Sequence, residues 1–228
     1  MSGTPSAFAT PAWWLTSAQL AVVISVQDPD RKGRVQVRLH GADPDGEALL
    51  WARVAVAFAG SNYGAFLLPG VGEEVVVVFS GGDVRYPIVI GALWTGANDL
   101  PDELSGDKVD RWTLTGKDGT RIAIVEEGAS QATVEIETPN GAKATLTDKS
   151  GGEITLTVGT NTLTMDTGGV SIETSGEFSV QASTMTINAG SVSVTSGTSD
   201  FSGATSSASH QTSSVVSGSY TPGAGNIW

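Results

Sequence analysis

Cysteine is absent from this sequence of 228 residues. Its absence excludes a disulfide scaffold, a thiolate nucleophile, a redox Cys pair and any zinc or iron–sulfur site with Cys ligands, and it fits assembly in a reducing cytoplasm. Long apolar runs are also missing, since the longest, residues 75–79, has only the length of a strand. The first residues lack the basic and apolar regions of a signal peptide. We therefore expect neither a signal peptide nor a transmembrane helix.

Positive charge is scarce. The chain has 12 Lys and Arg against 24 Asp and Glu, a formal net charge of −12, and no basic residue follows Lys149. Binding of nucleic acid requires a basic face that neutralises phosphates, so nucleic acid is not an expected partner. A single-stranded nucleic-acid module would also need a basic groove with stacking aromatic residues, and the acidic balance argues against it.

Residues that carry catalysis are few. His40 and His210 are the only histidines, and no GxSxG, HExxH or P-loop spacing occurs. The carboxylate pairs Glu73/Glu74 and Glu126/Glu127 lie in turn-like contexts, where solvated charge is the ordinary interpretation. His40 ends an alternating segment and is interpreted as structural. The sequence therefore predicts no enzymatic activity, no catalytic residue, no cofactor and no metal site, with His210 as a weak candidate ligand.

The first hundred residues are typical of short strands separated by turns. Residues 20–27, 34–39, 51–56, 74–79 and 87–93 are apolar or alternate with period 2, and Asp, Pro and Gly punctuate them. Five strands in so short a stretch favour a small closed barrel over an open sheet. The continuous run at 75–79 indicates a strand covered on both sides, with a neighbouring subunit as one source of the second cover.

Alternation returns after a linker rich in Gly, Pro and acidic residues. Period-2 segments at 112–115, 121–124, 133–136, 144–146 and 154–158 are followed by pairs of apolar residues spaced two apart, and these pairs recur every seven or eight residues. The predicted inward positions are Leu163, Met165, Val170, Ile172, Phe178, Val180, Met185, Ile187, Val192 and Val194.

The short repeat bears on how many chains build the structure. About 30 of the residues from 151 to 228 are Ser or Thr, a bias that alone suggests disorder. Each repeat offers one thin apolar stripe, whereas a single-chain β-solenoid uses about 20 residues per coil. A unit one third as long is explained if three chains wind together around an apolar axis. A single-chain solenoid and a disordered tail are the alternatives.

Five blocks of the first hundred residues resemble a known family. They begin at Gly33-Arg34-Val35-Gln36-Val37-Arg38-Leu39 and continue with 51–54, 64–69, 71–75 and 82–91. In order and spacing they are similar to the OB-fold domain of contractile-injection spike proteins. This family includes phage baseplate spikes, R-type bacteriocin spikes and the VgrG proteins of type VI secretion.

The resemblance implies an all-β fold with an N-terminal OB-fold barrel followed by a trimeric, intertwined, triple-stranded β-helix. The expected division is a hub-facing segment at 1–19, the OB-fold domain at 20–95, a linker at 96–111, and the β-helix spike with its C-terminal tip at 112–228. VgrG proteins carry a hub domain before the OB fold, so a separate hub protein is expected here. The linker is too short for the lysozyme domain that some phage spikes insert.

The function implied is a structural spike at the end of a contractile tail tube, driven into the target cell envelope when the sheath contracts. Its expected place is the baseplate of a virion or phage-like particle assembled in the bacterial cytoplasm. A bacteriocin or extracellular injection system carrying a tip protein or effector is the alternative. A trimeric glycan-binding or depolymerising tail protein is more remote, because it would need paired catalytic carboxylates and usually has wider coils.

The two ends carry the expected partner contacts. Trp13 and Trp14 form an aromatic pair before the first strand and are candidates for hub contact, with packing on the chain's own barrel as the alternative. The residues Tyr220, Ile227 and Trp228 are candidates for contact with a PAAR-type tip protein, since the C-terminus is blunt and apolar; alternatively, they plug the prism. Family spikes that bind iron use a His-x-His pair, and His210 has no second histidine beside it.

Overall fold

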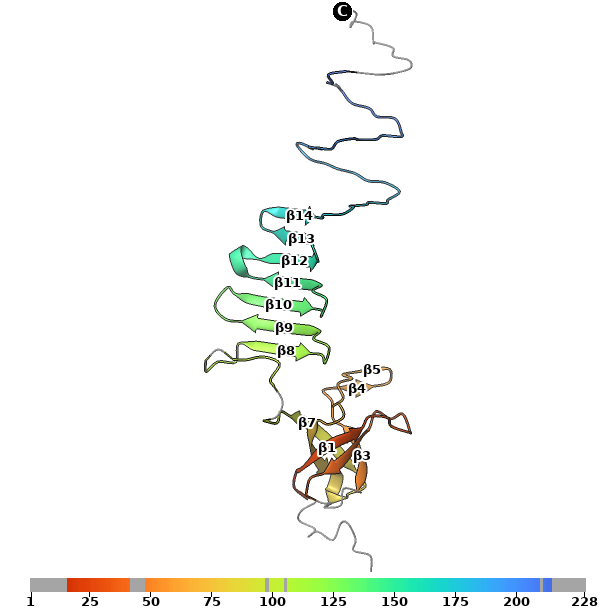
Figure 1. Cartoon of the computed structure of the whole chain (residues 1–228), viewed down its shortest axis with the longest axis vertical. Helices are drawn as coiled ribbons and strands as arrows, with labels where there is room; N and C mark the ends of the chain where they lie inside the picture. Colours follow the sequence, from red (N-terminus) through yellow and green to blue (C-terminus); the bar gives the residue numbers. More distant parts are fainter. Residues whose placement is uncertain (1–15, 42–47, 97–98, 105, 210, 215–228) are drawn as a thin grey trace, which may run out of the picture. The chain divides into compact units, whose positions relative to one another are not determined.

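The computed structural model describes residues 16–41, 48–96, 99–104, 106–209 and 211–214. Within these ranges the chain is all-β, with the short 3-10 turns η2 (Ser80–Gly82) and η3 (Lys149–Gly151) between strands. No helix among these residues is long and apolar enough to cross a membrane. The chain divides into two units, Met1–Glu177 and Phe178–Trp228, and every described strand belongs to the first (Figure 1).

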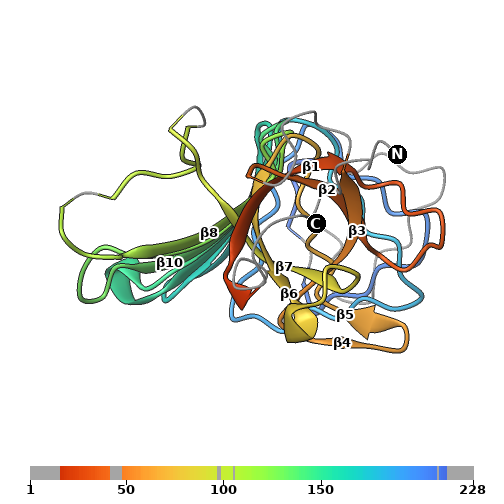
Figure 2. The same cartoon turned by 90° about the horizontal axis from the view of Figure 1, so that it is seen from below.

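Five strands close a barrel in the order β1-β2-β3-β7-β6, and they surround its interior in Figure 2. Their bounds are β1 (Gln19–Ser25), β2 (Val35–Leu39), β3 (Leu49–Val54), β6 (Glu74–Phe79) and β7 (Pro87–Leu93). All neighbours are antiparallel except β3 and β7, whose parallel pairing closes the barrel. The five strands and the closed barrel expected from the sequence are confirmed. A small hairpin, β4 (Ala59–Gly60) with β5 (Tyr63–Gly64), projects from it.

The barrel interior is filled by small and β-branched side chains. Val23 and Val37 lie opposite each other on β1 and β2, and Val77 follows on β6; all three are fully buried. Along β6 burial alternates, with Val75, Val77 and Phe79 in the core and the residues between them half-buried. The chain by itself covers one face of β6 and leaves the second partly open to solvent, so cover of that face by a neighbouring subunit stays a prediction.

The β1–β2 loop is held by one buried carboxylate. Asp28 accepts hydrogen bonds from the backbone N–H groups of Asp30 (3.0 Å), Lys32 (2.8 Å) and Arg34 (3.2 Å). The Arg34 guanidinium binds the same carboxylate at 2.7 Å and lies over the Trp51 ring. The hydrogen bond from the Arg34 side chain holds the pKa of Asp28 well below its ordinary value of 3.8, and the backbone N–H groups add to this against the opposing effect of burial.

We expect Asp28→Asn to destabilise the barrel at neutral pH, because an amide cannot accept the charge-assisted bonds of Arg34. A depressed folded-state pKa contributes stability that is fully present above the unfolded value and is lost as the pH falls through the folded one. The difference in the free energy of unfolding between wild type and Asp28→Asn should thus become smaller below about pH 3.8. Urea unfolding followed by tryptophan fluorescence at several pH values measures this difference. Asp30→Asn is the control, since the Asp30 side chain is 52% exposed; equal losses for both variants would contradict the role given to Asp28.

The second part of the first unit is a seven-stranded antiparallel sheet in which every strand pairs with its neighbours in sequence (Figure 1). Tight turns join the strands, and two residues suffice between β12 and β13 and again between β13 and β14. The strands are β8 (Arg111–Thr115), β9 (Arg121–Glu126), β10 (Ala132–Glu137), β11 (Lys143–Thr147), β12 (Glu153–Val158), β13 (Asn161–Asp166) and β14 (Gly169–Glu173).

The strand pairing of this sheet refines the expected intertwined fold. Strands β8 to β14 exchange their backbone hydrogen bonds within one chain, whereas an intertwined β-helix pairs strands of different chains. The ladders leave no room for a strand from another chain between them. The prediction of interchain pairing, made for 112–228, is therefore restricted to residues after β14.

The second unit, Phe178–Trp228, contains no strand among its described residues. Its apolar side chains are exposed in the single chain, from Phe178 and Val180 to Ile187. Phe201 is exposed as well and lies seven residues after Val194, so it continues the spacing of the earlier pairs although it is not among the predicted inward positions. The unit thus keeps the apolar spacing of strands, but no strand pairs with it among the residues that the structure describes.

Candidate functional site

The candidate site is one face of the β8–β14 sheet. Side chains alternate between the two faces of a strand, and directly opposed residues of antiparallel strands share a face. The register of the six strand pairs therefore assigns every residue to one face. It aligns apolar residues across all seven strands in two continuous rows.

The two rows together are called the apolar face below. The first row is Trp112, Ile124, Val134, Leu146, Ile154, Met165 and Val170. The second row is Leu114, Ile122, Ile136, Ala144, Leu156, Leu163 and Ile172.

The apolar face is open to solvent in the single chain. Leu156 at its centre is 44% exposed and Val170 at its end 63%, whereas the threonines on the opposite face of β12 are half-buried. Monomeric soluble proteins rarely expose a continuous apolar patch of this extent. Burial of such surface contributes about 25 cal/mol per Å². The face is therefore an interaction surface.

The opposite face is polar and carries an ion-pair network. Arg121 on β9 binds Glu135 and Asp102, both at 3.2 Å, and Lys143 on β11 binds Glu135 at 3.3 Å. Although burial raises the pKa of Asp102, hydrogen bonds from Thr113 and Arg121 and the charges of Arg121 and Arg111 outweigh this and lower it. The charges of Arg121, Lys143, Glu135 and Asp102 are thus paired within the chain itself.

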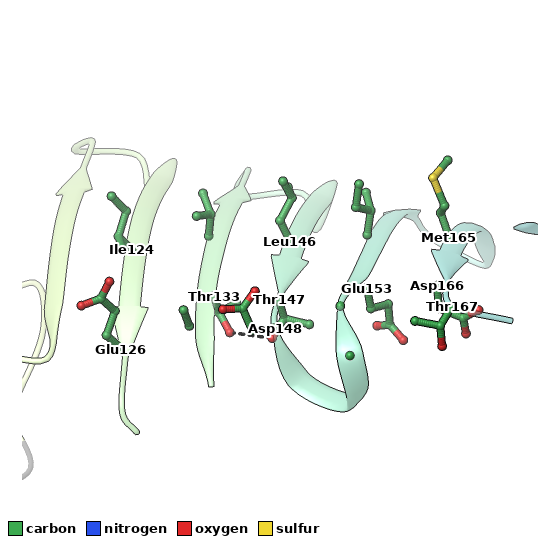
Figure 3. A pocket seen from close by; sticks show the side chains of 15 residues that line it. Ile124, Glu126, Thr133, Leu146, Thr147, Asp148, Glu153, Met165, Asp166 and Thr167 are labelled. Atoms are coloured by element: carbon green, nitrogen blue, oxygen red, sulfur yellow. Dashed lines mark hydrogen bonds between the residues drawn. The ribbon is translucent and has the colours of Figure 1, made fainter. Parts of the chain in front are cut away.

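A groove of about 630 Å³ runs along one border of the apolar face. Figure 3 shows Ile124, Leu146 and Met165 in one line across the strands, with carboxylates such as Glu126 and Asp148 in a second line beside them. The carboxylates thus lie at the border of the apolar face. Among the described residues no three His, Cys, Asp or Glu side chains are grouped so that they could hold a metal ion.

Four of the ten predicted inward residues lie on the apolar face: Leu163, Met165, Val170 and Ile172. The other six belong to the second unit, where all are exposed: Phe178, Val180, Met185, Ile187, Val192 and Val194. The ten row members on β8 to β12 lie in the predicted period-2 segments, but they were not among the predicted inward positions. The alternation there predicted strands without showing which face is buried.

Most of the other predicted site residues lie outside the described ranges, and a few lie within them. Trp13, Trp14, His210, Tyr220, Ile227 and Trp228 lie outside the described residues. His40 follows β2, where its Nε2 lies 3.1 Å from Glu74 Oε1 and its backbone N–H donates to Leu20. Of the second carboxylate pair, Glu127 binds Arg111 at 3.2 Å.

The barrel is similar in sequence to a known kind of domain. Residues 19–94 match the sequence model of the type VI secretion system/phage-baseplate injector OB domain. The match spans the strands β1 to β7. The resemblance to contractile-injection spike proteins that the sequence predicts is confirmed for this part of the chain.

Individual spike proteins give the same result. Type VI secretion system spike protein VgrG4b of Pseudomonas aeruginosa is 39% identical over 82 residues, which are 35% of this chain and 10% of the relative. VgrG1c of the same species is 32% identical over 143 residues, 56% of this chain and 20% of the relative. VgrG3 of Vibrio cholerae is 37% identical over 82 residues, 35% and 8% respectively. The chain thus spans a small part of the length of these spike proteins.

Proposed function

We propose that this chain is a structural spike of a contractile injection particle and that three copies assemble around the apolar face. The observation that carries the proposal is the pair of apolar rows, which stay exposed across all seven strands of a sheet whose other face is polar and carries an ion-pair network. In a prism of three sheets these rows face a common axis. The exterior is then made of threonines and paired charges.

Three chains fit the pattern better than one or two. After β14 the apolar pairs recur every seven or eight residues, about a third of the coil that one chain needs to enclose a core. Three chains supply one side each, so these apolar pairs line the axis of a triple-stranded β-helix. Closure also removes free sheet edges along the shaft, which otherwise promote aggregation.

The proposed role in puncturing the target cell envelope rests on the OB-fold barrel and on the stiffness of a shaft built from three chains. The injector OB domain matched by residues 19–94 is named for the phage baseplate and type VI secretion. In a ladder built from three chains, one chain cannot unfold unless the backbone hydrogen bonds that it shares with the other two are broken. Such a shaft therefore withstands the force of sheath contraction. No catalytic step belongs to this function. A bacteriocin or an extracellular injection particle fits the same geometry as a phage tail.

The partners follow from this placement. A hub protein joins the barrel end to the tail tube, and a PAAR-type tip protein covers the other end, with the cell envelope as a transient contact. The particle is assembled in the bacterial cytoplasm, and the spike belongs to its baseplate.

Gold-labelled antibodies against the purified chain, applied to contractile particles from its host, test this function. The label should lie at the baseplate end of the tail in electron micrographs, and deletion of the gene should leave particles without killing or infecting activity. Particles from the deletion strain serve as the labelling control. Label along the sheath, or fully active particles without the chain, would contradict the proposal.

A further inference from the structure

Another open surface lies on the barrel, between the β1–β2 loop and the β4–β5 hairpin. It is a cleft of about 700 Å³ and is called the hairpin cleft below. Phe58, Tyr63 and Phe66 line the hairpin cleft, and all three are exposed, Phe66 to 81%. Aromatic side chains that gather in an open cleft are typical of a surface that binds a partner.

The hairpin holds these aromatic side chains outward by its own bonds. Strand β4 pairs with β5, and just outside the pair the Ala65 N–H donates to the Phe58 carbonyl at 3.0 Å. The Tyr63 ring lies so close over Gly60 that a Cβ at the glycine would collide with it. The exposure of the aromatic side chains therefore belongs to a defined hairpin.

The β1–β2 loop adds positive charge to the hairpin cleft. Arg31 and Lys32 both line it. Lys32 lies 3.5 Å from Asp30, whereas Arg31 has no ion-pair partner among the residues that the structure describes. A cation without a partner beside exposed aromatic rings favours an occupant that is both acidic and apolar.

Residues 99–104 of the linker have this composition. The segment reads Asp99-Leu100-Pro101-Asp102-Glu103-Leu104, with three acidic residues and no basic one. Asp102 binds Arg121 of the chain's own sheet at 3.2 Å, which holds the segment in place. Leu100 and Leu104 nevertheless stay exposed, so the chain's own barrel does not bury them.

The strand directions place the hairpin cleft and the start of the linker at the same end of the barrel. Strands β3 and β7 run parallel, so the hairpin segment that follows β3 and the linker that follows β7 leave the barrel at one end. Strand β2 is antiparallel to β3, so the β1–β2 loop lies at this end as well. With three barrels around one axis, the linker of each copy begins near the hairpin cleft of its neighbour.

We propose that the hairpin cleft of each barrel binds residues 99–104 of a neighbouring copy, with Leu100 and Leu104 against the aromatic side chains and Glu103 beside Arg31. This rests on the proposed trimer, but it uses a surface of the barrel that the apolar face of the sheet does not include. The contact ties each barrel to the next one at the point where the chain passes into its sheet. The three barrels then cannot turn independently of one another.

A photochemical cross-linker in the hairpin cleft tests this contact. In the full-length variant Phe66→p-benzoylphenylalanine, the new side chain replaces an exposed ring, so the barrel should fold. After irradiation a boiled SDS gel should show bands above the chain mass of 23.3 kDa. Mass spectrometry of a digest of the two-chain band should join residue 66 to a peptide that contains residues 99–104.

The matched control is Tyr86→p-benzoylphenylalanine. Tyr86 is also exposed, but it lies between β6 and β7 at the opposite end of the barrel, so it should give no link to residues 99–104. In the Phe66 variant, the further change Arg31→Glu should lower the yield of linked chains about threefold, as for the loss of one exposed ion pair. Arg38→Glu makes the same charge change near the opposite end of β2 and should leave the yield unchanged.

The inference is overturned if the two-chain band joins residue 66 to a segment other than 99–104, or if no linked chains form although light scattering gives the mass of three chains. Equal yields for Arg31→Glu and Arg38→Glu would contradict the charge contact. A one-chain mass by light scattering would instead contradict the proposed function itself.

Discussion

Leu156→Lys is expected to abolish assembly of the three chains, whereas Thr155→Lys leaves it intact. Leu156 lies at the centre of the apolar face, so the substitution brings three ammonium groups toward one axis. An unpaired buried charge costs several kcal/mol, and here three are introduced together. The chain itself should still fold, because Leu156 is 44% exposed before assembly.

Light scattering and an unboiled SDS gel measure this effect. Thr155→Lys adds the same charge one residue away on the polar face, where its ammonium lies near Glu153. This control should keep the mass of three chains and an SDS-resistant band. Identical behaviour of the two variants would mean that the apolar face is not an interface.

Ile187→Asp is expected to open the C-terminal part of the shaft without separating the chains elsewhere. Ile187 belongs to the second unit and is 59% exposed in the single chain. In the proposed β-helix it points to the axis, where three carboxylates would repel one another at a cost of several kcal/mol each if unpaired. The seven-stranded sheets and their apolar rows remain.

Limited proteolysis with mass spectrometry of the fragments locates this effect. In the Ile187→Asp variant the protease should cleave the chain after residue 177, and the assembled chains should lose their resistance to SDS. The fragment that contains the seven-stranded sheet should stay protected. Thr186→Asp, the adjacent outward residue, should resist as wild type does. If both variants are equally resistant, the register proposed for the second unit is wrong.

The barrel could be predicted because its sequence signals are local. The predicted segment 87–93 coincides with β7, and the predicted 20–27 differs by one or two residues from β1 (Gln19–Ser25). Turn residues such as Asp28 and Gly33 fix where these strands end. The parallel pairing of β3 with β7 carries no such local signal, because it joins segments far apart in sequence. The two-residue strands β4 and β5 are too short to show a period.

The sequence predicts which residues of the candidate site share a face, but it does not predict which strands pair. Alternation tells which side chains share a face, so the apolar residues from 112 onward could be recognised. It does not tell whether the next strand in a ladder comes from the same chain or another. That distinction depends on the connections, such as the two-residue turn between β13 and β14, which returns the chain to its own sheet.

The mass of the purified chain in solution, measured by light scattering, decides whether copies of the chain assemble around the apolar face. Three assembled chains give a mass of three times 23.3 kDa, and we expect this mass together with an SDS-resistant band on an unboiled gel. A mass of one chain would contradict it, because the apolar face would then remain exposed without a partner of its own kind.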